Sequence, residues 1–196
     1  MLRLLPLLLF VVGMSQFAIG AWIPAKAALA QVLLERAWQN TNKRGERVRP
    51  WPWADTWPVA RITLPRLGAS WIVLSGASGR TLAFGPGHTD GSALPGERGA
   101  AIVSGHRDTH FASLRALRVA DEILVERTDG TQIRYRVDEL RVVDSRSARL
   151  RDPGIGRSLL LVTCWPFDAV TSGGPLRFVA SASAHDDRLA MNDSPR

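Results

Sequence analysis

The sequence predicts a mainly β fold, a closed or nearly closed barrel, with an apolar helix before it. From Val59 onward, short apolar runs alternate with turn residues, and few stretches are long enough for a helix. Seven or eight such runs fit between residues 59 and 183, a density typical of a barrel. Before them, the twenty residues Leu4–Ile23 contain no charge, which is enough for a helix to span a bilayer core of about 30 Å.

The N-terminal segment, residues 1–23, is predicted to be a signal-anchor, that is, a transmembrane helix. A cleavable signal peptide is the alternative, because Ala18-Ile19-Gly20 approximates a cleavage site of small residues. The apolar run continues past that site, so we expect the segment to be retained. With either alternative, the remainder of the chain is exported.

Residues 24–58 are predicted to be a membrane-proximal helix followed by a linker. The stretch 25–39 is rich in helix formers and has apolar residues at helical spacing. Charged residues, proline and tryptophan follow in Asn40–Pro58, as in an extended linker. We expect Trp51, Trp53 and Trp57 to pack on the following domain; the alternative is a place at the lipid headgroup layer.

The barrel domain is assigned to residues 59–183. Its expected strands are 61–64, 69–74, 99–104, 122–128, 131–137, 142–144, 158–163 and 176–182. The pair Asp129-Gly130 predicts a hairpin with a type I′ turn, and Phe111–Leu117 a short helix. Residues 184–196 have no apolar periodicity and are predicted to be a flexible tail.

The composition argues against several function classes. Twenty-five Lys and Arg against 18 Asp and Glu give a net charge of +7, but no basic run alternates with aromatic residues, so we expect no nucleic-acid partner. The single cysteine, Cys164, excludes an internal disulfide and a cysteine cage for a metal. No acidic cluster has metal-ligand spacing, and the glycine-rich segment Gly85–Gly99 lacks the order of a phosphate-binding loop. We therefore predict no metal and no cofactor.

Three residues are candidates for catalysis because of their places at predicted strand ends. Cys164 ends the most apolar strand, and His106 follows another apolar strand directly. Arg177 begins the next strand, thirteen residues after the cysteine, where a hairpin would return its guanidinium to the thiol. Each also has an ordinary structural explanation: a buried small hydrophobe, a hydrogen-bonded histidine and a solvated charge.

These three stretches resemble the sortases, the exported cysteine transpeptidases of bacteria. The family pattern Thr-Leu-x-Thr-Cys is matched by Leu160–Cys164, with leucine in place of the first threonine. His106 matches the family histidine in Gly-His-Arg, and Arg177 the family arginine in Pro-Leu-Arg-Phe-Val. The runs Gly-His-Arg-Asp-Thr-His-Phe and Thr-Cys-Trp-Pro-Phe look like the Gram-negative class, class GN.

The resemblance implies an eight-stranded sortase-type β-barrel with short helices, held at the inner membrane by a single N-terminal span. Its catalytic domain would lie on the periplasmic side. The implied activity is cleavage of a C-terminal sorting signal of the Leu-Pro-x-Thr-Gly type, between Thr and Gly. Cys164 would attack the scissile carbonyl, and His106 would protonate the leaving amine. Arg177 would stabilise the oxyanion, and an amine acceptor would resolve the thioester.

Other residues remain open as contributors. Asp108 is a candidate to orient His106 or Arg107, and His110 and His88 are competing bases. Thr163 has a supporting hydroxyl, although on a regular strand it faces away from its neighbour in sequence.

Two other functions are also compatible with the sequence. One is a membrane-anchored cysteine peptidase that hydrolyses its thioester. The other is a membrane-tethered β-barrel adaptor without catalysis, whose cysteine serves only for packing.

Overall fold

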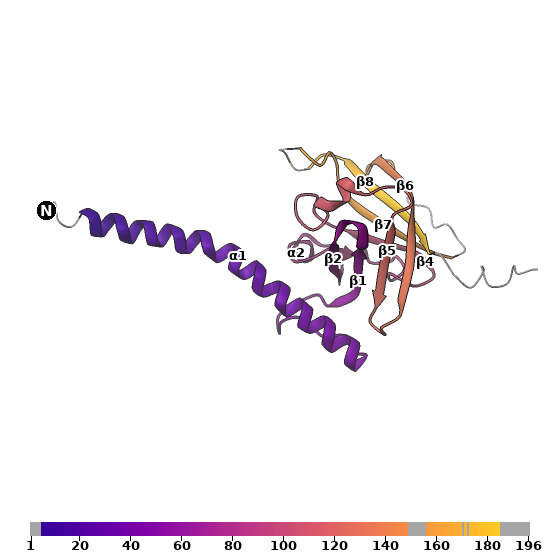
Figure 1. Cartoon of the computed structure of the whole chain (residues 1–196), viewed down its shortest axis with the longest axis horizontal. Coiled ribbons are helices and arrows are strands. Elements are labelled where there is room, and N and C mark those ends of the chain that lie inside the picture. The colour runs from indigo at the N-terminus through magenta and orange to yellow at the C-terminus, as the bar shows by residue number, and fades with distance from the viewer. Residues whose placement is uncertain (1–4, 149–155, 170, 172, 185–196) are drawn as a thin grey trace, which may run out of the picture.

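Eight strands close into a barrel beside a long N-terminal helix (Figure 1). This architecture is seen in a computed structural model, which describes residues 5–148, 156–169, 171 and 173–184. The mainly β, eight-stranded barrel predicted above, with few short helices, is therefore confirmed. The predicted tail beyond Ala184 and the first four residues of the predicted signal-anchor lie outside the described residues.

The helices and strands follow one another in a simple order. They are α1 Leu5–Arg44, β1 Pro58–Leu64, η2 Pro65–Leu67, β2 Ala69–Ser75, α2 Gly79–Leu82, β3 Gly87–His88, β4 Gly99–Ser104, η3 Ala112–Ala116, β5 Glu122–Arg127, β6 Gln132–Asp144, β7 Arg157–Cys164 and β8 Leu176–Ala184.

The barrel closes in the order β1-β2-β3-β4-β7-β8-β6-β5, and β5 pairs again with β1. Neighbouring strands are antiparallel except for two parallel pairs, β2 with β3 and β4 with β7. The second parallel pair matters for function, because the C-terminal ends of β4 and β7 reach the same edge of the barrel.

The core lies inside the barrel and follows the alternation of the strands. β1 alternates buried and half-buried residues along its whole length, as a strand with one face on a core does. The largest fully buried strand side chains in this interior are Ile62 and Leu64 of β1, Ile123 of β5, Tyr135 of β6, and Leu159 and Leu161 of β7. Phe111 and Leu114, from the connection between β4 and β5, complete this core.

Two parts of the barrel differ from the sequence prediction. The expected strand Val142–Asp144 is the last part of β6, one continuous strand of 13 residues. The two-residue strand β3 was not predicted, because it lies in the segment Gly85–Gly99 that we interpreted as a turn-rich connection. Its pairing with β2 and β4 closes the barrel at this point.

The hairpin between β5 and β6 is confirmed, but the predicted type I′ turn is wrong. Such a turn needs positive φ at both central residues. Gly130 has a φ of 79°, whereas Asp129 is not among the residues with positive φ. Gly130 N donates to Arg127 O at 3.0 Å, and Arg127 N donates to Thr131 O at 2.9 Å. The connection is therefore a three-residue loop with Gly130 in the left-handed position.

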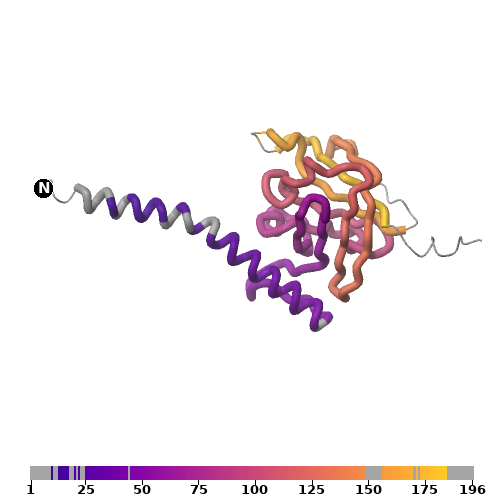
Figure 2. The backbone as a smooth tube through the Cα atoms, viewed as in Figure 1, coloured from indigo at the N-terminus to yellow at the C-terminus, as the bar shows by residue number. Residues whose placement is uncertain are grey.

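Helix α1 begins as a projecting arm and ends packed on the barrel (Figures 1 and 2). Its buried residues recur at helical spacing on one face: Ala30, Leu34, Ala37, Trp38 and Thr41. Glu35 accepts two hydrogen bonds from Arg61 Nη2 on β1, at 2.7 and 2.9 Å. The helix continues to Arg44, into the segment expected to be a linker.

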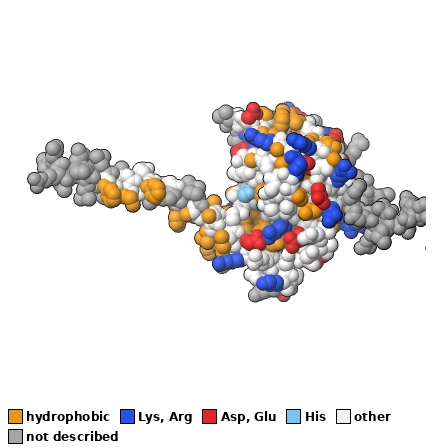
Figure 3. Space-filling model, in the orientation of Figure 1, with side chains coloured by type: hydrophobic (Ala, Val, Ile, Leu, Met, Phe, Trp, Pro, Cys, Tyr) orange, Lys and Arg blue, Asp and Glu red, His pale blue; other side chains and the backbone are white. Residues whose placement is uncertain are grey.

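The projecting part of α1 carries exposed apolar side chains, among them Phe10, Met14, Phe17 and Trp22 (Figure 3). Within the described ranges, however, we find no helix that is both long enough and apolar enough to cross a membrane. The predicted transmembrane helix over residues 1–23 is thus not supported.

Two of the three linker tryptophans pack against the protein. The Trp51 ring meets Phe84 edge-on at 4.8 Å, and the Arg47 guanidinium lies 5.0 Å from the ring centre of Trp57. Trp53 is 82% exposed. The expected packing on the following domain therefore holds for Trp51, whereas the ring contact of Trp57 is with Arg47 of the same linker segment.

Candidate active site

Cys164 and Arg177 face each other across the β7–β8 pair. They are the last register partners of these two antiparallel strands. Trp165 N donates to Leu176 O at 3.0 Å and extends the pairing one step beyond the cysteine. Cys164 is half-buried and forms no disulfide. The sheet thus holds the thiol and the arginine side by side at one edge of the barrel, as directly opposite residues share a face.

His106 reaches the same edge from the other side of β7. The parallel pairing of β4 and β7 ends with Ser104 opposite Val162, so His106 and Cys164 each lie two residues past this pair. Gly105 N donates to Val162 O at 3.1 Å, and Thr163 Oγ1 donates to Gly105 O at 2.7 Å. These bonds hold the chain just before His106 against the chain just before Cys164. The imidazole itself is exposed.

The three candidate residues therefore converge on one barrel edge from three neighbouring strands, β4, β7 and β8. The guanidinium of Arg177 is turned toward its own turn, where Nη1 donates to Gly174 O at 2.6 Å and Leu176 O at 2.9 Å. In the described part of the chain, its Nε and Nη2 make no hydrogen bond. These two nitrogens therefore remain free to donate hydrogen bonds to an oxygen of a substrate.

Thr163 supports the site from the core side. It is 2% exposed and does not point the same way as Cys164, as strand alternation predicts. Its hydroxyl instead fixes the Gly105 carbonyl, and so the start of the segment that carries His106.

An aromatic cluster adjoins the cysteine and the arginine. Trp165 follows Cys164, Phe178 follows Arg177, and Phe167 lies between them, with ring centres 5.2–6.2 Å apart. These rings pack on the core of the barrel. They thus extend the core at the end of β7 and the start of β8, where Cys164 and Arg177 are paired.

Asp108 orients Arg107 and not His106. Its Oδ1 accepts a hydrogen bond from Arg107 Nε at 3.0 Å, while the carboxylate is 74% exposed. The Arg107 side chain is buried, 8% exposed, and its guanidinium donates to three backbone carbonyls of the β7–β8 connection. These bonds could not be predicted from the sequence, because their acceptors are backbone oxygens about sixty residues away.

His110 is the second titratable group beside His106. Burial lowers the pKa of His110 below its ordinary value, and the positive charge of His106 lowers it further. At neutral pH the His110 imidazole is therefore held neutral. It stays close enough to compete with His106 as a proton acceptor.

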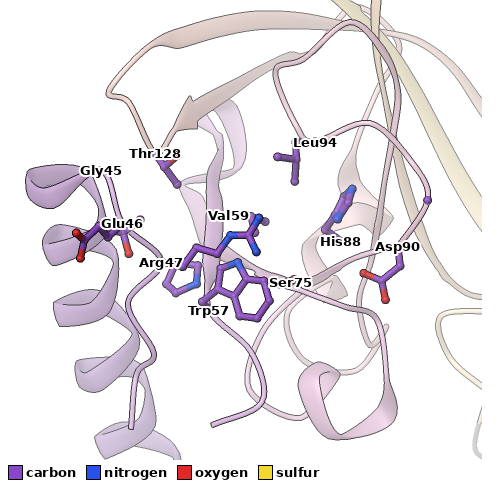
Figure 4. Close-up of a pocket in the computed structure, with 13 residues that line it drawn as sticks. Gly45, Glu46, Arg47, Trp57, Val59, Ser75, His88, Asp90, Leu94 and Thr128 are labelled. Atoms are coloured by element: carbon purple, nitrogen blue, oxygen red, sulfur yellow. The ribbon is translucent and has the colours of Figure 1, made fainter. Parts of the chain in front are cut away.

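His88, the other competing base, lies in a different site. Its Nε2 is 2.9 Å from Ala93 O and 3.0 Å from Ser92 Oγ, and its ring borders a cavity of about 550 Å³ (Figure 4). Figure 4 shows Arg47 and Trp57 side by side in this cavity, across from His88 and Asp90. None of the three candidate catalytic residues lines it. His88 therefore borders a cavity that does not include the cysteine.

No metal site accompanies these residues in the part of the chain that is described. Within it, no group of three or more His, Cys, Asp or Glu side chains is placed to hold an ion.

Comparisons with known proteins point to one family. A family model described as "Sortase domain" matches residues 62–185. Sortase D of Bacillus subtilis (strain 168) is 28% identical over 119 residues, which cover 60% of this chain and 59% of that relative's length.

Solved structures share the barrel. The Sortase D5 transpeptidase of Clostridium perfringens has a TM-score of 0.66 at 21% identity, covering 81% of this chain and 99% of that one. Sortase A of Corynebacterium diphtheriae has a TM-score of 0.61 at 25% identity, covering 81% and 85%.

Proposed function

This chain belongs to the sortase family, and from that membership we propose that it cleaves a C-terminal sorting signal through a thioester on Cys164 and passes the acyl group to an amine. Membership of the sortase family supports the activity of a cysteine transpeptidase. Cys164 is the one cysteine in the sequence, so it is the candidate nucleophile. The observation that carries the proposal is the convergence of His106, Cys164 and Arg177 at the ends of β4 and β7 and the start of β8.

In the first half-reaction, the Cys164 thiolate attacks the scissile carbonyl carbon. The resulting oxyanion accepts hydrogen bonds from Arg177, whose Nε and Nη2 have no partner among the described residues. When the C–N bond breaks, the His106 imidazolium gives its proton to the leaving amine. Cys164 is left as a thioester, and the released peptide carries away the neutral amine.

In the second half-reaction, an incoming amine attacks the thioester carbon and loses a proton to His106. The C–S bond breaks, and the thiolate and imidazolium are restored. Protons and charges are balanced over the two steps. The exposed position of His106 leaves this side of the cysteine open to the amine.

We propose a signal of the Leu-Pro-x-Thr-Gly type as the substrate, cut between Thr and Gly. The support for this signal is the sortase membership of the chain and the family-like runs around His106, Cys164 and Arg177. Membership of class GN is part of the same proposal and rests on the two sequence runs given above. The relatives named here are sortases A, D and D5, and none is described as class GN.

We also propose that residues 1–23 hold the enzyme at the inner membrane in a single pass, with the barrel on the periplasmic side. The support is the uncharged run Leu4–Ile23 and the exposed apolar side chains on this part of α1. Fractionation of the full chain, with protease added to intact spheroplasts, tests this placement. A full chain found in the soluble fraction would contradict it.

The product after addition of an amine tests the reaction. The full chain is incubated with a sorting-signal peptide and a short glycine peptide, and the products are analysed by mass spectrometry. We expect the peptide joined to the glycine amine. Hydrolysed peptide alone would show a peptidase, and an intact peptide with Cys164 inert to alkylation would show a non-catalytic adaptor.

A further inference from the structure

Two connections of the barrel meet beside the candidate catalytic residues. The β4–β5 connection, residues 105–121, begins with the segment that carries His106. The β7–β8 connection, residues 165–175, begins directly after Cys164. One buried side chain, Arg107, joins them.

The Arg107 guanidinium donates to three carbonyls of the β7–β8 connection. Nη1 donates to Pro166 O at 3.0 Å, and Nη2 donates to Ala169 O at 2.8 Å and Thr171 O at 3.0 Å. Nε donates to Asp108 Oδ1 at 3.0 Å, and this bond fixes the plane of the guanidinium group. All three nitrogens of the guanidinium therefore donate hydrogen bonds within the protein, and we assign Arg107 no part in binding substrate.

Arg115 makes a second contact of the same kind from η3. Its Nη2 donates to Phe167 O at 3.1 Å, and its guanidinium lies 5.7 Å from the Phe167 ring centre. Arg107 and Arg115, both in the β4–β5 connection, thus bind four backbone carbonyls of the β7–β8 connection.

His106 lies between two fixed points of the chain. On one side, Thr163 and Val162 hold Gly105; on the other, Arg107 is locked to the β7–β8 connection. Cys164 and Arg177 do not need this link, because the pairing of β7 with β8 holds them. The residue whose position depends on Arg107 is therefore His106.

We propose that Arg107 is a positioning residue, which keeps His106 in place over Cys164 by binding the connection that follows the cysteine. This inference rests on the proposed transpeptidase function. A buried guanidinium is suited to the task, since its rigid fork reaches three carbonyls at once, whereas a lysine ammonium would reach fewer. Loss of the link moves His106 relative to the scissile bond and slows proton transfer, while the pairing of β7 with β8 still holds Cys164 and Arg177.

The test compares kcat and KM for transfer in the full chain, with the variants Arg107→Met, Arg107→Lys and Asp108→Asn. We expect Arg107→Met to lower kcat by about tenfold to a hundredfold, as misplacement by about 1 Å does, with KM within about threefold. Arg107→Lys should lie between wild type and Arg107→Met. Asp108→Asn weakens the bond that orients the fork and should lower kcat in the same direction by less.

Arg134→Met is the matched control, because Arg134 lies on the outside of β6 with its side chain 67% exposed. It should leave both constants unchanged. If Arg107→Met does not fold, Asp108→Asn decides, since its exposed carboxylate is not needed for the core. A loss confined to KM, or wild-type kcat in both Arg107→Lys and Asp108→Asn, would overturn the inference. A wild-type chain without transfer activity would overturn the proposed function, and this inference with it.

Discussion

Cys164 and Arg177 are direct cross-strand partners at the open end of the β7–β8 pair. The twelve residues that lie between them in sequence leave the barrel and return to the same edge of it. His106 joins them through the parallel pairing of β4 with β7, which brings a residue 58 positions upstream to the same level as the cysteine. Two ladders of backbone hydrogen bonds, β4 with β7 and β7 with β8, therefore assemble the site.

Replacing Arg177 should affect turnover and not folding. Arg177→Ala removes the proposed oxyanion donor and is expected to lower kcat for transfer by about a hundredfold to a thousandfold. Arg177→Lys should retain part of the rate, because a charge remains. Thermal unfolding should be nearly unchanged, since within the described residues the guanidinium donates to carbonyls of its own turn and otherwise interacts with Asp144. A wild-type kcat in Arg177→Ala would show that Arg177 takes no part in the mechanism.

Gly105→Ala should damage both the core and the site. A Cβ at this position would lie 2.8 Å from ring atoms of Phe111, which is fully buried and packed edge-on against Trp71. Overpacking of this kind costs about 1–3 kcal/mol in the free energy of unfolding. Because His106 follows directly, kcat should fall as well.

The control for this substitution is Gly79→Ala in α2, where a Cβ meets nothing within 4 Å. Chemical denaturation of both variants is the measurement. If Gly105→Ala and the wild type have equal free energies of unfolding, the Phe111 ring moves aside without loss of stability, and the prediction is wrong.

The neutral state of His110 should make the protein less stable in mild acid. Its pKa is lowered in the folded protein, first by burial and then by His106. The unfolded chain therefore binds more protons once the pH falls below the ordinary histidine pKa of about 6.5, and the free energy of unfolding decreases. His110→Gln removes this contribution. Denaturation between pH 7 and pH 5 should show a shallower dependence in the variant; an identical slope would contradict the assignment.

Asp121 should stabilise the fold at neutral pH and lose this effect in acid. Its two carboxylate oxygens each accept a bond of 2.6 Å from Arg66, and Arg118 N donates to Oδ2 at 2.7 Å. The hydrogen bond from Arg66 is the main cause that lowers the pKa of Asp121. The stabilisation is therefore complete above the unfolded pKa of about 3.9 and lost as the pH falls through the folded value.

Asp121→Asn should accordingly lower the melting temperature at pH 7, with a smaller difference from wild type at pH 2. Glu139→Gln, at an exposed pair with Arg141 on β6, is the matched control and should shift the melting temperature little. A pH-independent difference for Asp121→Asn would show that the carboxylate charge is not involved.

Strand periodicity predicted most of the barrel because its strands are locally encoded. The run Gly99–Ser104 was placed at its observed bounds, and the strands carrying Cys164 and Arg177 within two residues. Strand β3 has only two residues, so no periodicity can reveal it; neighbouring strands define it. The turn at Asp129 is decided by one φ angle, which residue types alone do not fix.

The candidate site was predictable to the same extent. Strand ends placed the cysteine, the histidine and the arginine at one edge, whereas the contacts around them depend on tertiary structure. Arg107 reads as an ordinary surface arginine in sequence, and only the folded chain brings Pro166 and Thr171 to it. The role of Asp108 followed from the same contact.

Covalent trapping on Cys164 tests the central proposal most directly. The full chain is incubated with a library of peptides that end in Leu-Pro-x-Thr-Gly-like signals, and the intact protein is weighed by mass spectrometry. We predict a single acyl adduct on Cys164 that disappears when an amine is added and never forms in Cys164→Ala. An adduct that persists in Cys164→Ala, or no adduct with any peptide although the thiol is freely alkylated, would contradict the account.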